Sequence, residues 1–424
     1  MKMIPLKKAN ILIPHDVDMT KWSVIACDQY TSQNEYWDKV KEIVGNSPST
    51  LNITLPEIYL NDNDVFDKIK RINENMEDLL QSGNFTEYKD SLIYLERTQD
   101  DGRVRKGIIG MVDLEDYSYL ADSTSLIKAT EKTVVDRIPP RLRVRENALL
   151  ETPHVMLLID DPKKEIIDNL NERVGEEDKI YDFDLMLKGG HVKGYKLKDN
   201  LIEEIFNKLE AFKDKETFEK KYNVTDKPVL LFSVGDGNHS LATAKAHYEK
   251  LKETLSEEEY LNHPARYALV EVVNLHSEAL EFEPIHRVLF NVDADGLLTE
   301  FKNCYHIDEN DTEGQRIEYV CEGERKVLYV KRSCTNSNLA VGTLQSFLDN
   351  YLKNHPETKI DYIHDDDATI KLGSEKGNVA FLLPAMPKNE LFRTVILDGA
   401  LPRKTFSMGH SYDKRYYLEC RKIK

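Results

Sequence analysis

The side chains best suited to chemistry lie in one short stretch in the middle of the chain, Gly235-Asp236-Gly237-Asn238-His239-Ser240. The largely apolar run 228–234 before it is typical of a buried strand. From Leu241 onward, apolar side chains recur at helical spacing. This order predicts a strand, a tight turn and a helix, with Ser240 as the residue that caps the helix.

The turn suits a site that handles a phosphate and a proton. Gly235 and Gly237 permit positive φ angles and let a ligand approach the backbone closely. The first N–H groups of the helix favour an anion at that position, while Asp236 and His239 add a carboxylate and an imidazole. The stretch matches neither G-x-x-x-x-G-K-[ST] nor G-x-G-x-x-G. An ordinary strand-to-helix turn with a capping Asp is an equal alternative.

Four arginines gather within nine residues of an acidic chain, at Arg137, Arg141, Arg143 and Arg145. Guanidinium groups match phosphate and carboxylate oxygens in paired geometry. We expect this segment to fold back onto the turn at 235–240 and to form one anion site with it. The alternative is a solvated helix face whose charges are balanced by nearby acidic residues.

Near the N-terminus, polar and aromatic residues alternate in one segment. Asp28, Gln29 and Tyr30 are candidates to line a polar pocket, whereas Trp22 and Trp37 beside them favour a role as core anchors. The core reading is the stronger of the two for this segment.

Further along, His154 begins an apolar run and is more typical of a core histidine than of a ligand. His286 and Arg287 lie between apolar residues, which fits either a structural ion pair or a second anion contact. Arg403 and Lys404 place two cations side by side before the last strand.

The composition indicates an ordinary soluble globular protein that holds two or three structural units. The 424 residues are 40% hydrophobic and 31% charged, with a formal net charge of −17. That charge disfavours a nucleic-acid or anionic-membrane surface. Five scattered cysteines, without C-x-x-C spacing, argue against a disulfide framework and a structural zinc site. Without a span-length apolar run, we expect a cytoplasmic protein.

The order of elements predicts an α/β fold. An amphipathic helix is expected over 64–80, and Asp101-Gly102 is a strong hairpin signal between two strands. Further helices are expected over 165–178 and 201–218. We expect three interleaved units: an N-terminal mixed subdomain (1–125), a catalytic core (126–290) and a C-terminal α/β subdomain (291–424).

With these motifs in view, the chain resembles, over nearly its full length, the family catalogued as domain of unknown function 1015. Its central turn is similar to the Asp-Gly-His-His-Arg turn of the ParB/sulfiredoxin-like superfamily, which includes the free serine kinases. Asn238 replaces the first His and Ser240 the Arg. The resemblance implies a ParB/sulfiredoxin-like core with a small mixed sheet, elaborated by N- and C-terminal α/β subdomains.

The resemblance also implies an activity: transfer of a phosphoryl group to the hydroxyl of free L-serine, with pyrophosphate, ADP or ATP as donor. In the resembling kinases a glutamate upstream of the turn acts as base, and Glu131 is the candidate by pattern. His239 would contact the phosphoryl group and Asp236 would hold Mg²⁺.

The remaining expectations follow from the same resemblance and from the motifs above. The predicted phosphate-binding residues are Arg137, Arg141, Arg143, Gly235, Gly237, Asn238 and Ser240. The predicted substrate-binding residues are His286, Arg287, Arg403 and Lys404. Expected partners are small molecules, with no nucleic acid or membrane. The competing functions are a phosphatase or phosphohydrolase acting on a small phosphate ester, and a non-enzymatic ParB-like regulator that binds a nucleotide or DNA.

Overall fold

The computed structural model describes residues 4–120, 123–308, 312–335 and 337–424. The chain divides into two compact units, each described here by itself. Unit 1 comprises Met1–Ala129, Thr133–Leu280 and His410–Lys424, and unit 2 comprises Thr130–Lys132 and Glu281–Gly409.

Unit 1 is built on a large mixed sheet. Its ten strands within the described residues are β1 (Leu6–Lys7), β4 (Ile93–Thr98), β5 (Val104–Asp113), β6 (Tyr117–Ser118), β7 (Ile127–Ala129), β9 (Met156–Ile159), β10 (Lys179–Asp184), β11 (His191–Lys196), β12 (Phe232–Asp236) and β13 (Tyr267–Asn274). Their order is β10-β11-β4-β5-β13-β9-β12-β7-β6, with β1 on β5. The pairs β13–β9, β12–β7 and β6–β7 are parallel, and the others are antiparallel.

The α/β class is therefore confirmed, but the sheet is larger than the small one predicted. Strands from both sides of residue 125 pair within it, so no boundary of this sheet falls there. The division at Leu280–Glu281 lies near the boundary predicted at residue 290. The three-part division itself stays a prediction.

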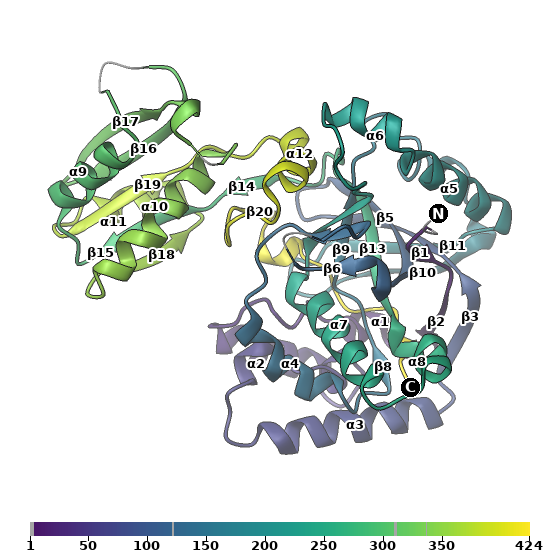
Figure 1. Ribbon diagram of the computed structural model, residues 1–424. Coiled ribbons are helices and arrows are strands. Elements are labelled where there is room, and N and C mark those ends of the chain that lie inside the picture. The colour runs from purple at the N-terminus through teal and green to yellow at the C-terminus, as the bar shows by residue number, and fades with distance from the viewer. Residues whose placement is uncertain (1–3, 121–122, 309–311, 336) are drawn as a thin grey trace. The chain divides into compact units, whose positions relative to one another are not determined.

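Both faces of this sheet are covered, because side chains on a strand alternate between faces. On β13, Ala268, Val270 and Val272 belong to one apolar cluster, while Leu269 belongs to another. The first cluster includes side chains of α5 (Asp199–Phe212) and α7 (Asn238–Lys252), and the second those of α2 (Asn34–Val44) (Figure 1).

The N-terminal part of unit 1 adds a further apolar cluster. Its elements are the strand pair β2 (Ala9–Pro14) and β3 (Phe85–Ser91), α1 (Met19–Trp22), α3 (Val65–Gln81), and the pair β8 (Leu150–Glu151) and β21 (Arg421–Lys422). The amphipathic helix predicted over 64–80 is thus confirmed as α3. Trp22 and Trp37 are fully buried, as core anchors should be. The other helices of the unit are α4 (Ile138–Arg145), α6 (Lys215–Tyr222) and α8 (Glu257–Asn262).

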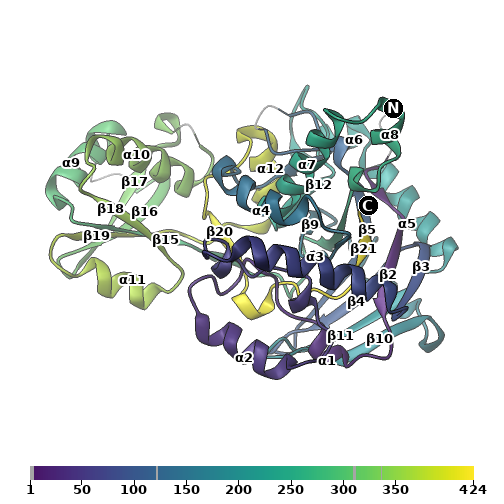
Figure 2. The same cartoon turned by 90° about the horizontal axis from the view of Figure 1, so that it is seen from below.

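Unit 2 is built on a five-stranded antiparallel sheet. Its order is β17-β16-β19-β15-β18, formed by β15 (His286–Phe290), β16 (Gln315–Cys321), β17 (Glu324–Val330), β18 (Lys359–Ile363) and β19 (Asn378–Leu382). The helices α9 (Ala294–Cys304) and α10 (Ala340–Asn354) cover one face and α11 (Asp366–Gly373) the other (Figure 2). The unit also contains α12 (Lys388–Asp398) and the strand pair β14 (Phe282–Pro284) and β20 (Phe406–Met408).

Across the described residues, no helix combines the length and the apolar character that crossing a membrane requires.

Candidate active site at the start of helix α7

The central turn has the predicted order of strand, turn and helix. Strand β12 ends at Asp236 and α7 begins at Asn238. The pairing of β12 with β9 shifts in register between Val234 and Asp236, so Gly235 is an extra residue in β12. Such bulges re-aim the next side chain, and here that side chain is Asp236.

Gly237 makes the tight change of direction from strand to helix. Its φ of 79° lies in the left-handed region that favours glycine. A Cβ at this position would lie 2.9 Å from Cα of Val155 and 3.3 Å from Cδ2 of His154. The glycine therefore allows the start of α7 to lie directly against the residues that precede β9.

Helix α7 begins three residues earlier than predicted. Gly237 occupies the N-cap position and Ser240 lies within the first turn, so the assignment of Ser240 as the cap was wrong. A glycine N-cap has no side chain that could accept a hydrogen bond from the first-turn N–H groups. The positive end of the helix dipole is then directed at the turn, where it favours an anion. His239 lies in this first turn and accepts a hydrogen bond at Nε2 from the backbone N–H of Val134, at 3.4 Å.

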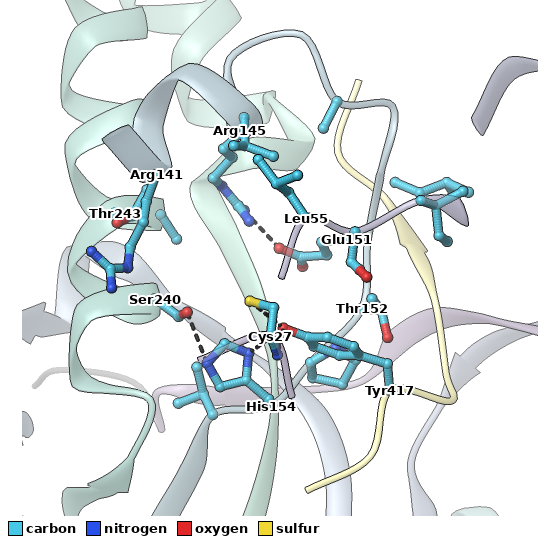
Figure 3. A pocket seen from close by; sticks show the side chains of 18 of the residues that line it. Cys27, Leu55, Arg141, Arg145, Glu151, Thr152, His154, Ser240, Thr243 and Tyr417 are labelled. Atoms are coloured by element: carbon cyan, nitrogen blue, oxygen red, sulfur yellow. Dashed lines mark hydrogen bonds and ion pairs between the residues drawn. The ribbon is translucent and has the colours of Figure 1, made fainter. Parts of the chain in front are cut away.

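His154 is the centre of a hydrogen-bonded group beside this helix start (Figure 3). It is 5% exposed, and its Nε2 lies 2.9 Å from Oγ of Ser240. Its Nδ1 lies 3.0 Å from the hydroxyl oxygen of Tyr417, and that hydroxyl donates to Sγ of Cys27 at 2.9 Å. Burial raises the pKa of the Cys27 thiol. Cys27 is therefore not a thiolate nucleophile at neutral pH.

Asp28 faces the same ring nitrogen of His154 as Ser240 does, with 3.6 Å between its Oδ2 and Nε2. Burial acts to raise the pKa of Asp28, but the charge of His154, a hydrogen bond from Gln29 and the charge of Lys414 outweigh it. The resulting pKa is below the ordinary value of 3.8. Asp28 therefore carries a negative charge at neutral pH beside the imidazole of His154.

Asp236 contributes the second carboxylate, and Lys414 faces it with 3.6 Å between Nζ and Oδ2. In phosphoryl-transfer sites, Mg²⁺ is commonly held by one or two carboxylates together with phosphates of the substrate. Asp236 fits this mode. An all-protein cage does not fit, since no three His, Cys, Asp or Glu side chains of the described residues gather into a metal cluster.

A cavity of ≈ 160 Å³ opens beside this group. Its polar wall includes Cys27, Glu57, Arg141, His154 and Ser240. The rest of the wall is largely apolar and comes from α3, α4, α7 and β8, with Met76, Val144, Ala244 and Leu150 among its residues. A small molecule bound here would have its polar end against His154 and Ser240.

The arginine segment begins at Arg137, in a 3₁₀ turn, and continues as helix α4, which packs against α7. The single anion site that we expected the segment to form with the turn stays a prediction. Arg141 donates from Nε to Oε1 of Glu57 at 2.7 Å and lines the cavity. Burial raises the pKa of Glu57 in spite of the charge of Arg141. Arg145 pairs with Glu151 at 2.6 Å. Arg143 lies over the ring of Phe66, at 5.5 Å from its centroid, and Arg137 is exposed.

Glu131 belongs to unit 2, where it lies with three predicted substrate-binding residues. The N–H of Thr405 donates to Oε1 of Glu131 at 3.3 Å, and Glu131 forms an isolated bridge with Leu401. Burial raises the pKa of Glu131, against hydrogen bonding from the Lys404 backbone and the charges of Lys404 and Arg287. Its role as the base stays a prediction.

Arg287 and Arg403 lie on the ring of Tyr362, at 5.2 and 5.5 Å from its centroid. Arg287 is fully buried and donates to Oε1 of Gln345 at 3.0 Å and to the carbonyl of Arg403 at 3.3 Å. His286 lies apart from this group in its contacts, because its Nε2 is 2.6 Å from Oδ1 of Asp366.

Three contributors to the site were not assigned to it from sequence. His154 was interpreted as a core residue, and Tyr417 and Lys414 gave no signal because they lie more than 170 residues after the turn. Asp28 was considered for a polar pocket; it lies 3.6 Å from His154 but is not among the residues that line the cavity. A histidine placed by Pro153 directly before a buried strand was the available clue.

Comparisons with known proteins give distant likenesses in structure and one clear family. No curated protein matches the sequence. Among solved structures, a free serine kinase in complex with AMP is similar with a TM-score of 0.39 and 9% identity, covering 74% of this chain and 91% of that chain. SbnI with a C-terminal truncation, from Staphylococcus aureus, is similar with a TM-score of 0.36 and 10% identity, covering 71% and 82%.

A conserved hypothetical protein from Pyrococcus furiosus is similar with a TM-score of 0.37 and 10% identity, covering 73% of this chain and 93% of that chain. The profile of a family described as "Protein of unknown function (DUF1015)" matches residues 11–351. That match includes the whole turn, helix α4 and His154, while Lys414 and Tyr417 lie beyond it. Since it spans most of the chain, the protein belongs to the DUF1015 family.

Proposed function

We propose that this protein is a phosphotransferase that phosphorylates the hydroxyl of free L-serine, with pyrophosphate or a nucleotide as donor. The observation that carries the proposal is the start of α7, where a glycine-capped helix N-terminus meets Asp236, His154 and Asp28. Phosphoryl transfer requires little covalent chemistry from a protein; it requires positioning and positive charge around the phosphoryl group. The helix start and its neighbouring cations supply both.

The transfer step needs a base near the acceptor hydroxyl. The serine oxygen forms a bond to phosphorus, the bond from phosphorus to the donor's leaving oxygen breaks, and the hydroxyl proton passes to a carboxylate. We propose Glu131 for this role from the sequence, and its raised pKa brings it nearer to the pH at which a base works best. Asp28 is the carboxylate that the geometry of unit 1 favours, because it contacts His154.

The remaining roles follow from charge and position. Asp236 would hold Mg²⁺ together with the donor's phosphates, and the ion would supply positive charge to the phosphoryl oxygens. His239, in the first turn of α7, would contact the transferring group. We propose the residues of the turn and the arginines of α4 as the phosphate site, and Arg287, Arg403, Lys404 and His286 as the contacts of the serine carboxylate.

A single assay tests the proposal. Purified protein with L-serine and Mg²⁺ is supplied in turn with pyrophosphate, ADP or ATP, and O-phospho-L-serine is measured by mass spectrometry. We expect phosphoserine with at least one donor. Release of inorganic phosphate without serine consumption would indicate a phosphohydrolase instead, and donor binding without turnover would indicate a nucleotide-binding regulator.

A further inference from the structure

We propose that Lys414 is an anion-binding residue of this site, and that Arg97 and Arg105 are the positioning residues that hold it there. The inference rests on the proposed function, because the anion would be the phosphoryl donor. It concerns a segment, residues 410–424, that lies outside the region matched by the family profile.

Lys414 is buried beside the start of α7. Its side chain is 10% exposed. Its ammonium group lies 3.6 Å from the Asp236 carboxylate, which is longer than a hydrogen bond, and its charge also lowers the pKa of Asp28. A buried ammonium group normally forms short hydrogen bonds, because losing water is otherwise costly. The ammonium group therefore has donor capacity to spare at the helix start.

The position is also unfavourable for a cation by itself. The N-terminal end of a helix carries a partial positive charge and stabilises anions rather than cations. Gly237 provides no capping side chain to offset that charge. A phosphate at the turn would accept hydrogen bonds from Lys414 and from the first-turn N–H groups at once. Such an anion would explain why a lysine lies at this end of α7.

Two buried arginines fix the backbone around Lys414. Arg97 is 2% exposed and donates to the carbonyls of Tyr412 at 2.6 Å and of Lys414 at 2.5 Å. Arg105 is 1% exposed and donates to the carbonyl of Asp413 at 2.8 Å. Three successive carbonyls are thus held by guanidinium groups that project from β4 and β5, which are strands of the central sheet.

Arg415, the residue after Lys414, connects this segment by hydrogen bonds to two other parts of the chain, at Pro153 and at Ala26. Arg415 donates from Nε to the carbonyl of Pro153 at 3.0 Å, next to His154. Its own carbonyl accepts from the N–H of Ala26 at 2.9 Å, two residues before Asp28. A displacement of this segment would therefore move Lys414 and, with it, the chain next to His154 and the chain next to Asp28.

A binding experiment tests the role of Lys414. Titration calorimetry with inorganic pyrophosphate or ADP, each with Mg²⁺, compares the wild type with Lys414→Met, Lys414→Gln and Lys414→Arg. Loss of a charge-assisted contact to phosphate should weaken binding by about 10- to 100-fold in the two neutral variants. Lys414→Arg keeps the charge and should retain most of the affinity. Lys422→Met, in the exposed part of the same segment, is the matched control and should bind as the wild type does.

The outcomes separate this inference from the proposed function. If the wild type binds neither pyrophosphate nor ADP, the proposed function fails. If the wild type binds and both neutral variants bind equally well, Lys414 is a structural counter-ion of Asp236 and the inference is overturned. Equal loss in Lys414→Arg and Lys414→Gln would also overturn it, because charge would then not be the property that matters.

Kinetics test the role of the arginines. Arg97→Lys keeps the charge but cannot hold two carbonyls with one planar group. If Arg97 positions Lys414, this variant should raise the donor KM by several-fold, on the order of one lost hydrogen bond, while kcat at saturating donor changes little. A lower Tm with an unchanged donor KM would show that Arg97 only stabilises the fold.

Discussion

Two buried cations, Arg287 in unit 2 and Lys414 in unit 1, show different uses of the same charge. Arg287 donates to a glutamine side chain and to the carbonyls of Ile285 and Arg403, and it lies on the ring of Tyr362. Lys414 has one carboxylate at 3.6 Å. The N–H donors of Arg287 are occupied by acceptors within the protein. The ammonium group of Lys414 keeps N–H donors for the anion that we propose.

The comparison indicates how to separate structural from functional charge in this protein. A fully hydrogen-bonded buried group stabilises a fold, and its removal leaves other groups unsatisfied. A buried charge with a long, incomplete contact is costly unless a ligand completes it. By this criterion we expect the site in the region around the start of α7, and the contacts of Arg287 favour a structural role that exists beside, or in place of, a substrate contact.

The largest effect is expected from removing the base. Replacement of Glu131 by Gln or of Asp28 by Asn keeps the shape but removes the proton acceptor, so kcat should fall by about 10²- to 10⁴-fold in whichever variant has lost it. Donor affinity should stay nearly unchanged in that variant. Steady-state kinetics with serine and the active donor check this, and wild-type turnover in both variants would exclude both carboxylates.

The pH dependence of the wild type separates the same two candidates. A base must be deprotonated, so the rate falls as pH decreases through its pKa. Burial raises the pKa of Glu131 above the ordinary 4.5, whereas the surroundings of Asp28 bring its pKa below 3.8. An acid limb of kcat/KM above pH 4.5 supports Glu131, and its absence down to that pH supports Asp28.

Removal of the imidazole from the first turn of α7 should have the next largest effect. His239→Ala is expected to lower kcat by about 10²- to 10³-fold, the cost of one lost contact to a transferring group. His247, on the same helix, provides a control position. A variant with unchanged kcat and a lower Tm would place His239 in the packing of the turn.

The Arg287→Met variant tests the other side of the comparison. We expect the free energy of unfolding to fall by about 1–3 kcal/mol, because buried acceptors lose their donor. Chemical denaturation measures this, and a lower stability with an unchanged KM for serine would remove Arg287 from the proposed contacts of the serine carboxylate. A higher KM for serine at unchanged stability would instead support Arg287 as a substrate contact.

The smallest effect concerns the exposed member of the arginine segment. Arg137→Ala should raise the donor KM by no more than several-fold, since an exposed charge contact contributes about 1 kcal/mol or less. Lys422→Ala, an exposed cation outside the arginine segment, is the matched control. Unchanged donor kinetics across Arg137, Arg141 and Arg143 variants would remove the arginine segment from the phosphate site.

Local features of the fold were predictable from the sequence, because they depend on neighbouring residues. The strand, turn and helix at 232–252, the helix at 65–81 and the hairpin at Asp101-Gly102 were all found. The helix expected over 165–178 was wrong, since only short 3₁₀ turns at Leu170–Glu172 and Glu176–Asp178 form there. The buried residues Ile166, Ile167 and Leu170 have the spacing of an amphipathic helix, and this spacing led to the wrong prediction.

The helix expected over 201–218 is divided into two. Asp214 accepts a hydrogen bond from the N–H of Thr217 and caps a new helix, α6, at Lys215. The side-chain cap ends the continuity that the apolar period suggested.

The gathering of the site residues could not be predicted, because it depends on contacts between distant segments. Asp28, His154, Ser240 and Tyr417 come from four parts of the chain, and the long-range strand order of the central sheet brings them together. His154 looked like a core histidine for a valid reason, since it is buried. Its contacts with Ser240 and Tyr417, rather than its burial, distinguish His154 from an ordinary core histidine.

The hydrogen bonds between strand β2 and the segment 410–424 have a consequence for biosynthesis. Leu12 and Cys420 exchange backbone hydrogen bonds at 2.8 and 2.9 Å, and Tyr417 and Lys414 belong to the same late segment. A nascent chain emerges from the ribosome with its N-terminal end first. The turn, the arginine helix and His154 are therefore all synthesised before the segment that completes their surroundings, and a ribosome-bound chain has an incomplete site until Tyr417 is free to dock.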